Sequence, residues 1–128
     1  MEDAKLILVV DDEPRMRRFM QMNLDLEGYR VIEAGNGLEA LNRVRENLPN
    51  MVLLDVMMPE MDGFAACAKL KSSPQSEGIP VILLTGVAKY ISRSKYPLDG
   101  VLRAEAEEYL EKPLEPEALL KAVAAHVK

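Results

Sequence analysis

The chain lacks the features of secreted, membrane-spanning and nucleic-acid-binding proteins. Its single cysteine, Cys67, excludes an internal disulfide and is typical of a reducing compartment. No apolar run approaches the ~20 residues of a membrane span, and the N-terminus has no basic region followed by a long apolar one. The net charge of −5 argues against nucleic acid or membrane as a direct partner. We therefore expect a cytoplasmic protein.

The length and composition are those of one globular domain. With 128 residues, 48% of them hydrophobic and 29% charged, the chain is long enough for a buried core and too short for two domains. We expect a single domain over residues 1–128. Cys67 lies in an apolar stretch, so we expect it to be buried.

Strand-like and helix-like segments alternate along the chain. We expect strands at residues 5–10, 29–34, 51–54, 80–84 and 106–110, and helices at 14–27, 38–48, 63–71 and 116–127. Residues 87–104 are less regular, and we expect a helix, a loop and a short turn there. Three of the strands are continuous apolar runs, which is typical of strands covered on both faces. The pattern predicts an α/β fold, a five-stranded parallel, doubly wound, flavodoxin-like sheet with strand order 2-1-3-4-5.

Polar residues follow the expected strands where each one ends. Asp11 and Asp12 follow the first strand, Asp55 the third, Thr85 the fourth and Lys112 the fifth. Because the carboxyl ends of parallel strands meet at one edge of a sheet, we expect these side chains to converge. This is also the edge at which open α/β sheets place their binding sites.

Three converging carboxylates need a counter-charge. At an effective dielectric near 20, two such groups at ~4 Å repel by about 4 kcal/mol, so either their pKa values rise or a cation binds. Carboxylate oxygens suit Mg²⁺, and the backbone carbonyl of Met57 is a candidate further ligand. Lys112 and Thr85 add an ammonium and a hydroxyl, which together would receive a phosphoryl group, with Asp55 as the nucleophile. The Lys112–Pro113 bond is a candidate cis peptide.

Four strings in the chain carry a family resemblance. They are Val9-Val10-Asp11-Asp12-Glu13, Leu53-Leu54-Asp55-Val56-Met57-Met58-Pro59-Glu60-Met61-Asp62-Gly63, Leu84-Thr85-Gly86 and Tyr109-Leu110-Glu111-Lys112-Pro113. In this order, at strand ends, they resemble the response-regulator receiver domains of two-component signalling. The resemblance covers essentially the whole chain. A receiver of this kind either stands alone, as chemotaxis regulators do, or forms part of a longer regulator.

The resemblance implies a role for each residue of the expected site. Asp55 would accept a phosphoryl group from a histidine kinase or a histidine phosphotransfer protein and later lose it slowly by hydrolysis. Asp12 and Asp55 would bind Mg²⁺, with Asp11 acting through water. Thr85 and Lys112 would hold the phosphoryl group, and movement of Thr85 would let Tyr109 turn inward to signal to an unknown protein target. The family is thus a phosphoacceptor switch rather than an ordinary enzyme.

The chain also departs from the usual receiver pattern. The stretch between Thr85 and Lys112 is lengthened, which affects the face that receivers use for output. Met57 and Val87 lie two residues beyond Asp55 and Thr85, at positions that influence water attack on the acyl phosphate. Both are apolar and cannot orient a water molecule, so we expect a long-lived phosphorylated state.

Three other interpretations are weaker. The segment Gly35-Asn36-Gly37-Leu38-Glu39-Ala40 imitates a dinucleotide-binding fingerprint, but it follows the second strand and leaves Lys112 and Thr85 without a role. An aspartyl phosphatase would need an acid two residues after its nucleophile, where Met57 stands. A binding module that has lost phosphorylation would not need all of the site residues.

We expect His126, near the end of the chain, to contact the last helical carbonyls.

Overall fold

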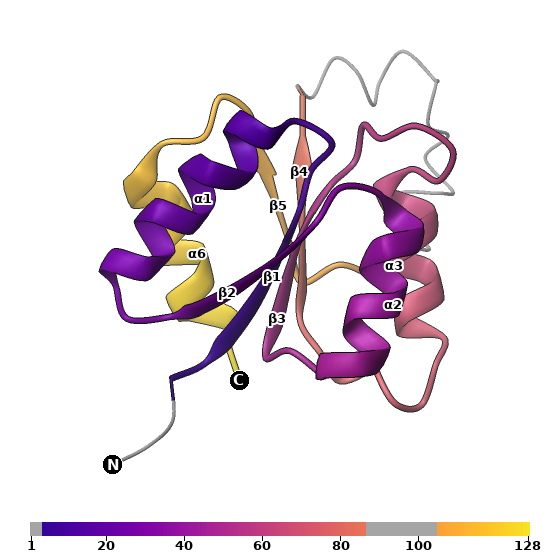
Figure 1. Ribbon diagram of the computed structural model, residues 1–128. Helices are drawn as coiled ribbons and strands as arrows, with labels where there is room; N and C mark the ends of the chain where they lie inside the picture. The colour runs from indigo at the N-terminus through magenta and orange to yellow at the C-terminus, as the bar shows by residue number, and fades with distance from the viewer. Residues whose placement is uncertain (1–3, 87–104) are drawn as a thin grey trace.

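The computed structural model describes residues 4–86 and 105–128, which form a parallel sheet between two helical layers (Figure 1). In chain order the elements are β1 (Leu6–Val10), α1 (Pro14–Leu26), β2 (Arg30–Ala34), α2 (Gly37–Asn47), β3 (Met51–Asp55), α3 (Gly63–Lys71), β4 (Val81–Thr85), β5 (Glu108–Glu111) and α6 (Pro116–His126). The five strands are all parallel and lie in the order β2-β1-β3-β4-β5. The predicted fold and strand order are confirmed.

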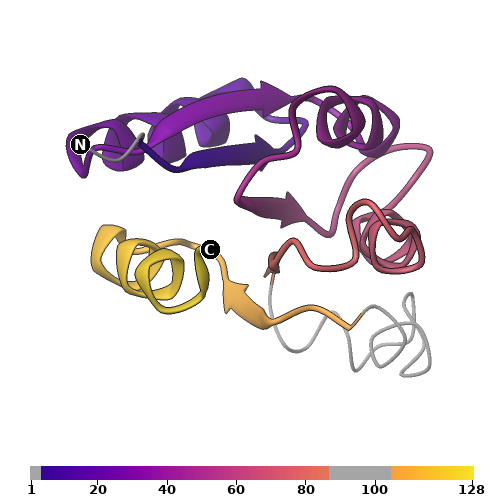
Figure 2. The ribbon, with the colours of Figure 1, turned by 90° about the horizontal axis from the view of Figure 1, so that it is seen from below.

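Helices cover both faces of the sheet. Helices α1 and α6 lie on one face, and α2 and α3 lie on the other (Figure 2). Successive residues of β1 alternate between the layers: Ile7 and Val9 pack toward α1 and α6, whereas Leu8 and Val10 pack toward α2 and α3. A strand that is buried on both sides needs apolar residues at every position. This explains why β1, β3 and β4 read as continuous apolar runs.

The helix ends follow local chemistry. Pro14 occupies the first position of α1, where its missing N–H has no cost. Gly28, with φ of 92°, follows the end of that helix in a conformation that favours glycine. The side chains of Asn36 and Asp62 cap α2 and α3 by accepting the backbone N–H groups of Glu39 and Ala65, each at 2.8 Å.

Some details differ from the sequence prediction. Strand β5 covers Glu108–Glu111 rather than residues 106–110. His126 contacts a carboxylate instead of helical carbonyls, since its Nε2 lies 2.7 Å from Oε1 of Glu108. Cys67 is buried as expected.

The elements expected in residues 87–104, and Val87 with them, lie outside the described residues. Among the helices that are described, none has the length and apolarity needed to cross a bilayer.

Candidate functional site

Three acidic side chains meet at the carboxyl edge of the sheet. Asp11 directly follows β1, and Asp55 is the last residue of the neighbouring strand β3, on which Leu54 pairs with Val10. Carboxylate oxygens of Asp11, Asp12 and Asp55 all lie within 4.8 Å of one another. Asp11 and Asp55 are buried, with exposed fractions of 0% and 1%, while Asp12 is exposed. The cluster therefore has a buried base and an open rim.

Lys112 supplies the positive charge of the site. Its Nζ lies 3.0 Å from Oδ2 of Asp11, to which it donates a hydrogen bond, and 3.0 Å from Oδ1 of Asp55. The bond to Pro113 is cis, as expected. Burial would lower the pKa of Lys112, but the negative charges of Asp55 and Asp11 outweigh burial and raise it. The side chain is therefore a fixed cation at neutral pH.

Thr85, Met57 and Tyr109 lie on or shortly after the strands β3, β4 and β5. Thr85 ends β4 beside the end of β3, its side chain is buried, and its carbonyl accepts the backbone N–H of Lys112 at 2.7 Å. Met57 follows β3, and its backbone hydrogen-bonds to Asp55. Tyr109 lies on β5 and is 38% exposed. All the site residues that the sequence predicted thus come from one edge of the sheet, apart from Tyr109, which lies within β5, three residues before Lys112.

The surroundings of the Asp55 carboxyl group disfavour its ionised form. Burial, and then the negative charge of Asp11, raise the pKa of Asp55 to about 6, although Lys112 and the Met57 backbone act in the opposite direction. Oδ1 of Asp55 is buried, and the ammonium of Lys112, 3.0 Å away, is its closest charged neighbour among the described residues. Such an atom is costly to bury unless a further positive group approaches it.

The carboxylate oxygens of this cluster fit a divalent cation. A hard cation prefers carboxylate oxygens, and this site offers them from three residues, one of them open to solvent. A cation beside Oδ1 of Asp55 would both satisfy that atom and offset the repulsion between the buried acids. The donor set therefore suits a metal ion such as Mg²⁺.

The raised pKa makes stability depend on pH. Because folding raises the pKa of Asp55 from 3.8 to about 6, the folded state favours the protonated form. The stability that this provides is complete below pH 3.8 and is lost as the pH rises through 6. The loss is on the order of 3 kcal/mol. In EDTA we expect Asp55→Asn to be more stable than wild type at pH 8, by an amount that shrinks toward pH 4.

Urea unfolding of both proteins across this pH range measures the difference. Added Mg²⁺ should stabilise the wild type and leave Asp55→Asn almost unchanged, because the variant has one carboxylate fewer at the cluster. A gap between the two proteins that stays constant from pH 4 to pH 8 would contradict the assignment of the raised pKa to Asp55.

Arg17 supports the acidic loop, although it is not among the residues that the sequence predicted for the site. Its Nη1 donates to the backbone carbonyl of Asp11 at 2.7 Å, and its Nε donates to Oε1 of Glu33 at 3.0 Å. In the sequence Arg17 stands between Arg15 and Arg18, where all three look like one solvated helix face. The position of Arg17 in the first turns of α1, shortly after Asp11 and Asp12, is the one sequence feature that indicates a place near the site. A hydrogen bond from a side chain to a backbone carbonyl leaves no pattern in a sequence.

Gly63 was recognised only as part of a family string. Its N–H donates to the carbonyl of Val56 at 3.0 Å, which draws the start of α3 against the end of β3. A Cβ atom on Gly63 would lie 2.3 Å from the carbonyl oxygen of Asp55 and 2.8 Å from Cα of Val56. A glycine at a helix start beside a strand end is the only sequence signal of this close approach.

Comparison with known proteins agrees with this geometry. The family model described as the response regulator receiver domain matches residues 7–124. The chain is 34% identical over 125 residues to Protein PilG of Pseudomonas aeruginosa, an alignment that covers 98% of this chain and 89% of PilG. It is 41% identical over 120 residues to a "Probable transcriptional regulator ycf27" of Porphyra purpurea, covering 93% of this chain and 46% of the relative. The chain thus spans about half the length of the ycf27 relatives.

Solved structures share the fold over almost their whole length. The chemotaxis protein CheY4 of Vibrio cholerae superposes with a TM-score of 0.85 at 27% identity, covering 97% of this chain and 99% of CheY4. A putative response regulator from Chloroflexus aurantiacus gives a TM-score of 0.84 at 30% identity, with 95% and 96% covered.

Proposed function

This chain belongs to the response regulator receiver domains of two-component systems, and on that premise we propose that it is a switch whose Asp55 accepts a phosphoryl group. The observation that carries the proposal is the position of Lys112 Nζ, 3.0 Å from carboxylate oxygens of both Asp11 and Asp55. A nucleophilic carboxylate beside a fixed cation is the arrangement that phosphoryl transfer requires. The donor would be a histidine kinase or a histidine phosphotransfer protein.

In the proposed reaction, a carboxylate oxygen of Asp55 attacks the phosphorus of a phosphohistidine. The new P–O bond forms as the P–N bond breaks, and the released imidazole takes up a proton. With a pKa of about 6, Asp55 is mostly ionised at pH 7 and can act as the nucleophile. Lys112 and the Thr85 hydroxyl would hold the equatorial oxygens of the phosphoryl group, where negative charge is spread during transfer.

The metal would be Mg²⁺, held by Asp12, Asp55 and the backbone carbonyl of Met57, with Asp11 acting through water. Bound there, it would neutralise charge on the phosphoryl oxygens and on the acids. Lys112 already offsets part of the negative charge of Asp11 and Asp55. Asp12, on the open rim, is the acid best placed to meet a cation arriving from solvent.

The signal would pass through Thr85 and Tyr109. A phosphoryl group on Asp55 would attract the Thr85 hydroxyl through a charge-assisted hydrogen bond, and the space that Thr85 leaves would favour an inward Tyr109 ring. Tyr109 is 38% exposed and therefore has room to change burial. The shift is limited to the difference in interaction energy between the two states, a few kcal/mol. A downstream protein in the cytoplasm would bind the changed conformation.

Intact-protein mass after incubation with Mg²⁺ and acetyl phosphate tests the proposal. We expect the wild type to gain the mass of one phosphoryl group and Asp55→Asn to gain none. Transfer in this assay forms the same P–O bond while acetate leaves as the other product. If calorimetry shows Mg²⁺ binding but neither protein gains mass, the chain would be a binding module without phosphorylation or would require its cognate donor, and incubation with a phosphorylated histidine kinase separates these two outcomes. Continuous release of phosphate from simple monoesters would instead indicate a phosphatase.

The phosphorylated state should be long-lived because Met57 cannot orient a water molecule. We expect Met57→Asn, which adds a polar amide of smaller size, to speed hydrolysis of the acyl phosphate by about tenfold. The decay of the phosphorylated mass after removal of acetyl phosphate gives the rate. Met57→Leu is the matched control, since it changes shape without adding a polar group. Equal decay rates in all three proteins would refute this role for Met57.

A further inference from the structure

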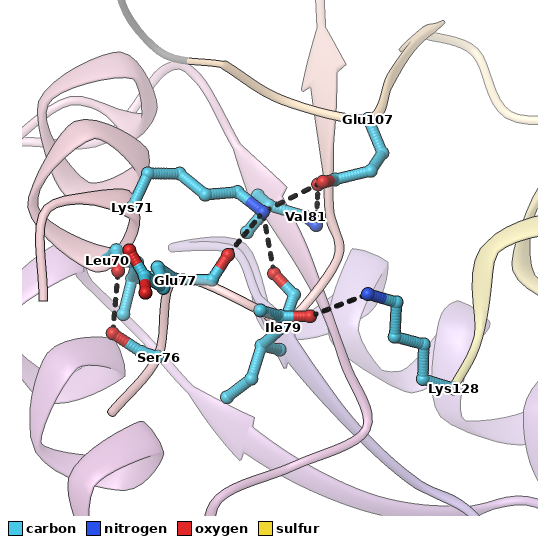
Figure 3. A network of polar contacts seen from close by, with 9 residues as sticks. Leu70, Lys71, Ser76, Glu77, Ile79, Val81, Glu107 and Lys128 are labelled. Carbon is cyan, nitrogen blue, oxygen red and sulfur yellow. Dashed lines mark hydrogen bonds and ion pairs between the residues drawn. The ribbon is translucent and has the colours of Figure 1, made fainter. Parts of the chain in front are cut away.

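An ion pair between a buried lysine side chain and a glutamate that is 35% exposed joins the end of α3 to the residue that precedes β5 (Figure 3). Lys71 is the last residue of α3, and its side chain is only 7% exposed. Its Nζ lies 2.9 Å from Oε2 of Glu107 and donates to the carbonyl of Ile79 at 2.8 Å. A lysine buried this deeply is rare in proteins and needs partners of this kind.

Glu107 also bonds to the first residue of β4. Its Oε1 accepts the backbone N–H of Val81 at 2.7 Å, and its own backbone N–H donates to the carbonyl of Val81 at 2.9 Å. Val81 is the first residue of β4. Glu107 therefore bonds to both the N–H and the carbonyl of Val81, one through its side chain and the other through its backbone. These bonds lie where β4 and β5 begin to pair.

The burial pattern of β5 and its connection to β4 specify its register only weakly. The strand has four residues, Glu108–Glu111, whose exposure alternates between intermediate and exposed, so no fully buried face specifies the pairing. The connection from β4 to β5, residues 86–107, is too long for a tight turn to set it. In this situation a strand is prone to slip along its neighbour unless a specific contact holds it.

The register matters because the site residues of β5 depend on it. In the observed pairing Leu83 lies opposite Tyr109 and Thr85 opposite Glu111. Lys112 then donates its N–H to the Thr85 carbonyl at 2.7 Å and reaches both acids with its ammonium. A slip of one residue would move Lys112 by ~3.3 Å along the strand and exchange the faces of Tyr109 and Leu110.

We propose that Lys71 and Glu107 are positioning residues for phosphoryl transfer, because their ion pair fixes the register of β5 on β4 and so holds Lys112 against the acids. The proposal rests on the function proposed above. Because Glu107 is 35% exposed, its ion pair with Lys71 adds little to stability by itself. The best-attested use of such specific polar contacts is to select one register among several. The partners of this pair, in the α3–β4 connection and at the starts of β4 and β5, match that use.

The test compares Lys71→Met with Lys128→Met. The control removes an ammonium that donates to the Gly78 carbonyl at 3.2 Å, in the same α3–β4 connection and not on β5. At saturating Mg²⁺ we expect Lys71→Met to take up phosphoryl groups from acetyl phosphate about tenfold to a hundredfold more slowly. Lys128→Met should match the wild type. The Mg²⁺ affinity should not fall in either variant, because the acids follow β1 and β3 and not β5, and displacing the Lys112 ammonium in Lys71→Met would leave them more negative.

A second variant and a direct structural readout complete the experiment. Lys71→Met/Glu107→Ala removes the pair without leaving a lone charge, and it should show the same loss of rate. In both variants amide hydrogen exchange at Val81 and Lys112 should accelerate, as expected if pairing between β4 and β5 loosens. Unchanged rates and protection in Lys71→Met would overturn the proposal, and so would a parallel loss of Mg²⁺ affinity, which would indicate general destabilisation. If wild type takes up no phosphoryl group, the proposed function fails, and amide exchange alone decides the register role.

Discussion

Replacing Lys112 by methionine is expected to slow phosphoryl transfer to Asp55 by about a hundredfold to a thousandfold, the usual effect of removing one preorganised donor from a transition state. Methionine keeps much of the side chain's length and removes its charge. The Nζ atom lies 3.0 Å from the oxygens of Asp11 and Asp55. Without it, the phosphoryl oxygens lose a cation that is already in place before the reaction begins.

A second effect of this variant acts through Asp55 itself. Lys112 opposes the burial and the Asp11 charge that raise the pKa of Asp55 to about 6, so the variant should have a still higher value. A larger fraction of Asp55 is then protonated at pH 7 and cannot attack phosphorus. Raising the pH should restore this part of the lost rate and leave the part that is due to the missing cation.

Phosphorylated mass against time at pH 7 and pH 9 measures both effects. Lys121→Met, the same change at an exposed lysine of α6, is the control and should match the wild type. A rate for Lys112→Met within about threefold of wild type would show that this lysine does not stabilise the transition state. The remaining candidates for that role would then be Thr85 and the metal.

The fold and the acidic cluster could be predicted because both follow from backbone geometry. Strands buried on both faces must be largely apolar, and β1, β3 and β4 are, apart from the last residue of β3 and of β4. The first polar residue after each run then falls at the same edge of a parallel sheet, which brings Asp11, Asp55 and Thr85 to one place. Neither step depends on how individual side chains pack.

The supporting contacts could not be predicted because they depend on packing between distant segments. Arg17 bonds to a carbonyl, and any residue has a carbonyl, so no partner is marked in the sequence. Lys71 and Glu107 are both charged, and charged residues are ordinarily placed on the surface. The predicted boundaries of β5 are wrong because its alternating side chains form too weak a pattern to show where pairing with β4 begins.

Replacing Gly63 by alanine is expected to cost at least about 1–3 kcal/mol in the free energy of unfolding, the range for overpacked sites. The added methyl carbon would lie 2.3 Å from the carbonyl oxygen of Asp55 and 2.9 Å from its carbonyl carbon. Both contacts are with backbone, so no flexible side chain can move aside. The N–H of Gly63 is bonded to the Val56 carbonyl at 3.0 Å, which resists separation of α3 from β3.

Gly78→Ala provides the matched control, because a Cβ atom there would meet nothing within 4 Å. Urea unfolding should show the cost for Gly63→Ala and a change within about 0.5 kcal/mol for Gly78→Ala. The clash falls on the backbone of Asp55, so relieving it should also displace the Asp55 carboxylate. Mg²⁺ affinity, measured well below the unfolding transition, should therefore fall in Gly63→Ala alone. Equal stability of the two variants would mean that the end of β3 can yield to α3, and the acidic cluster would then not depend on this close approach for its geometry.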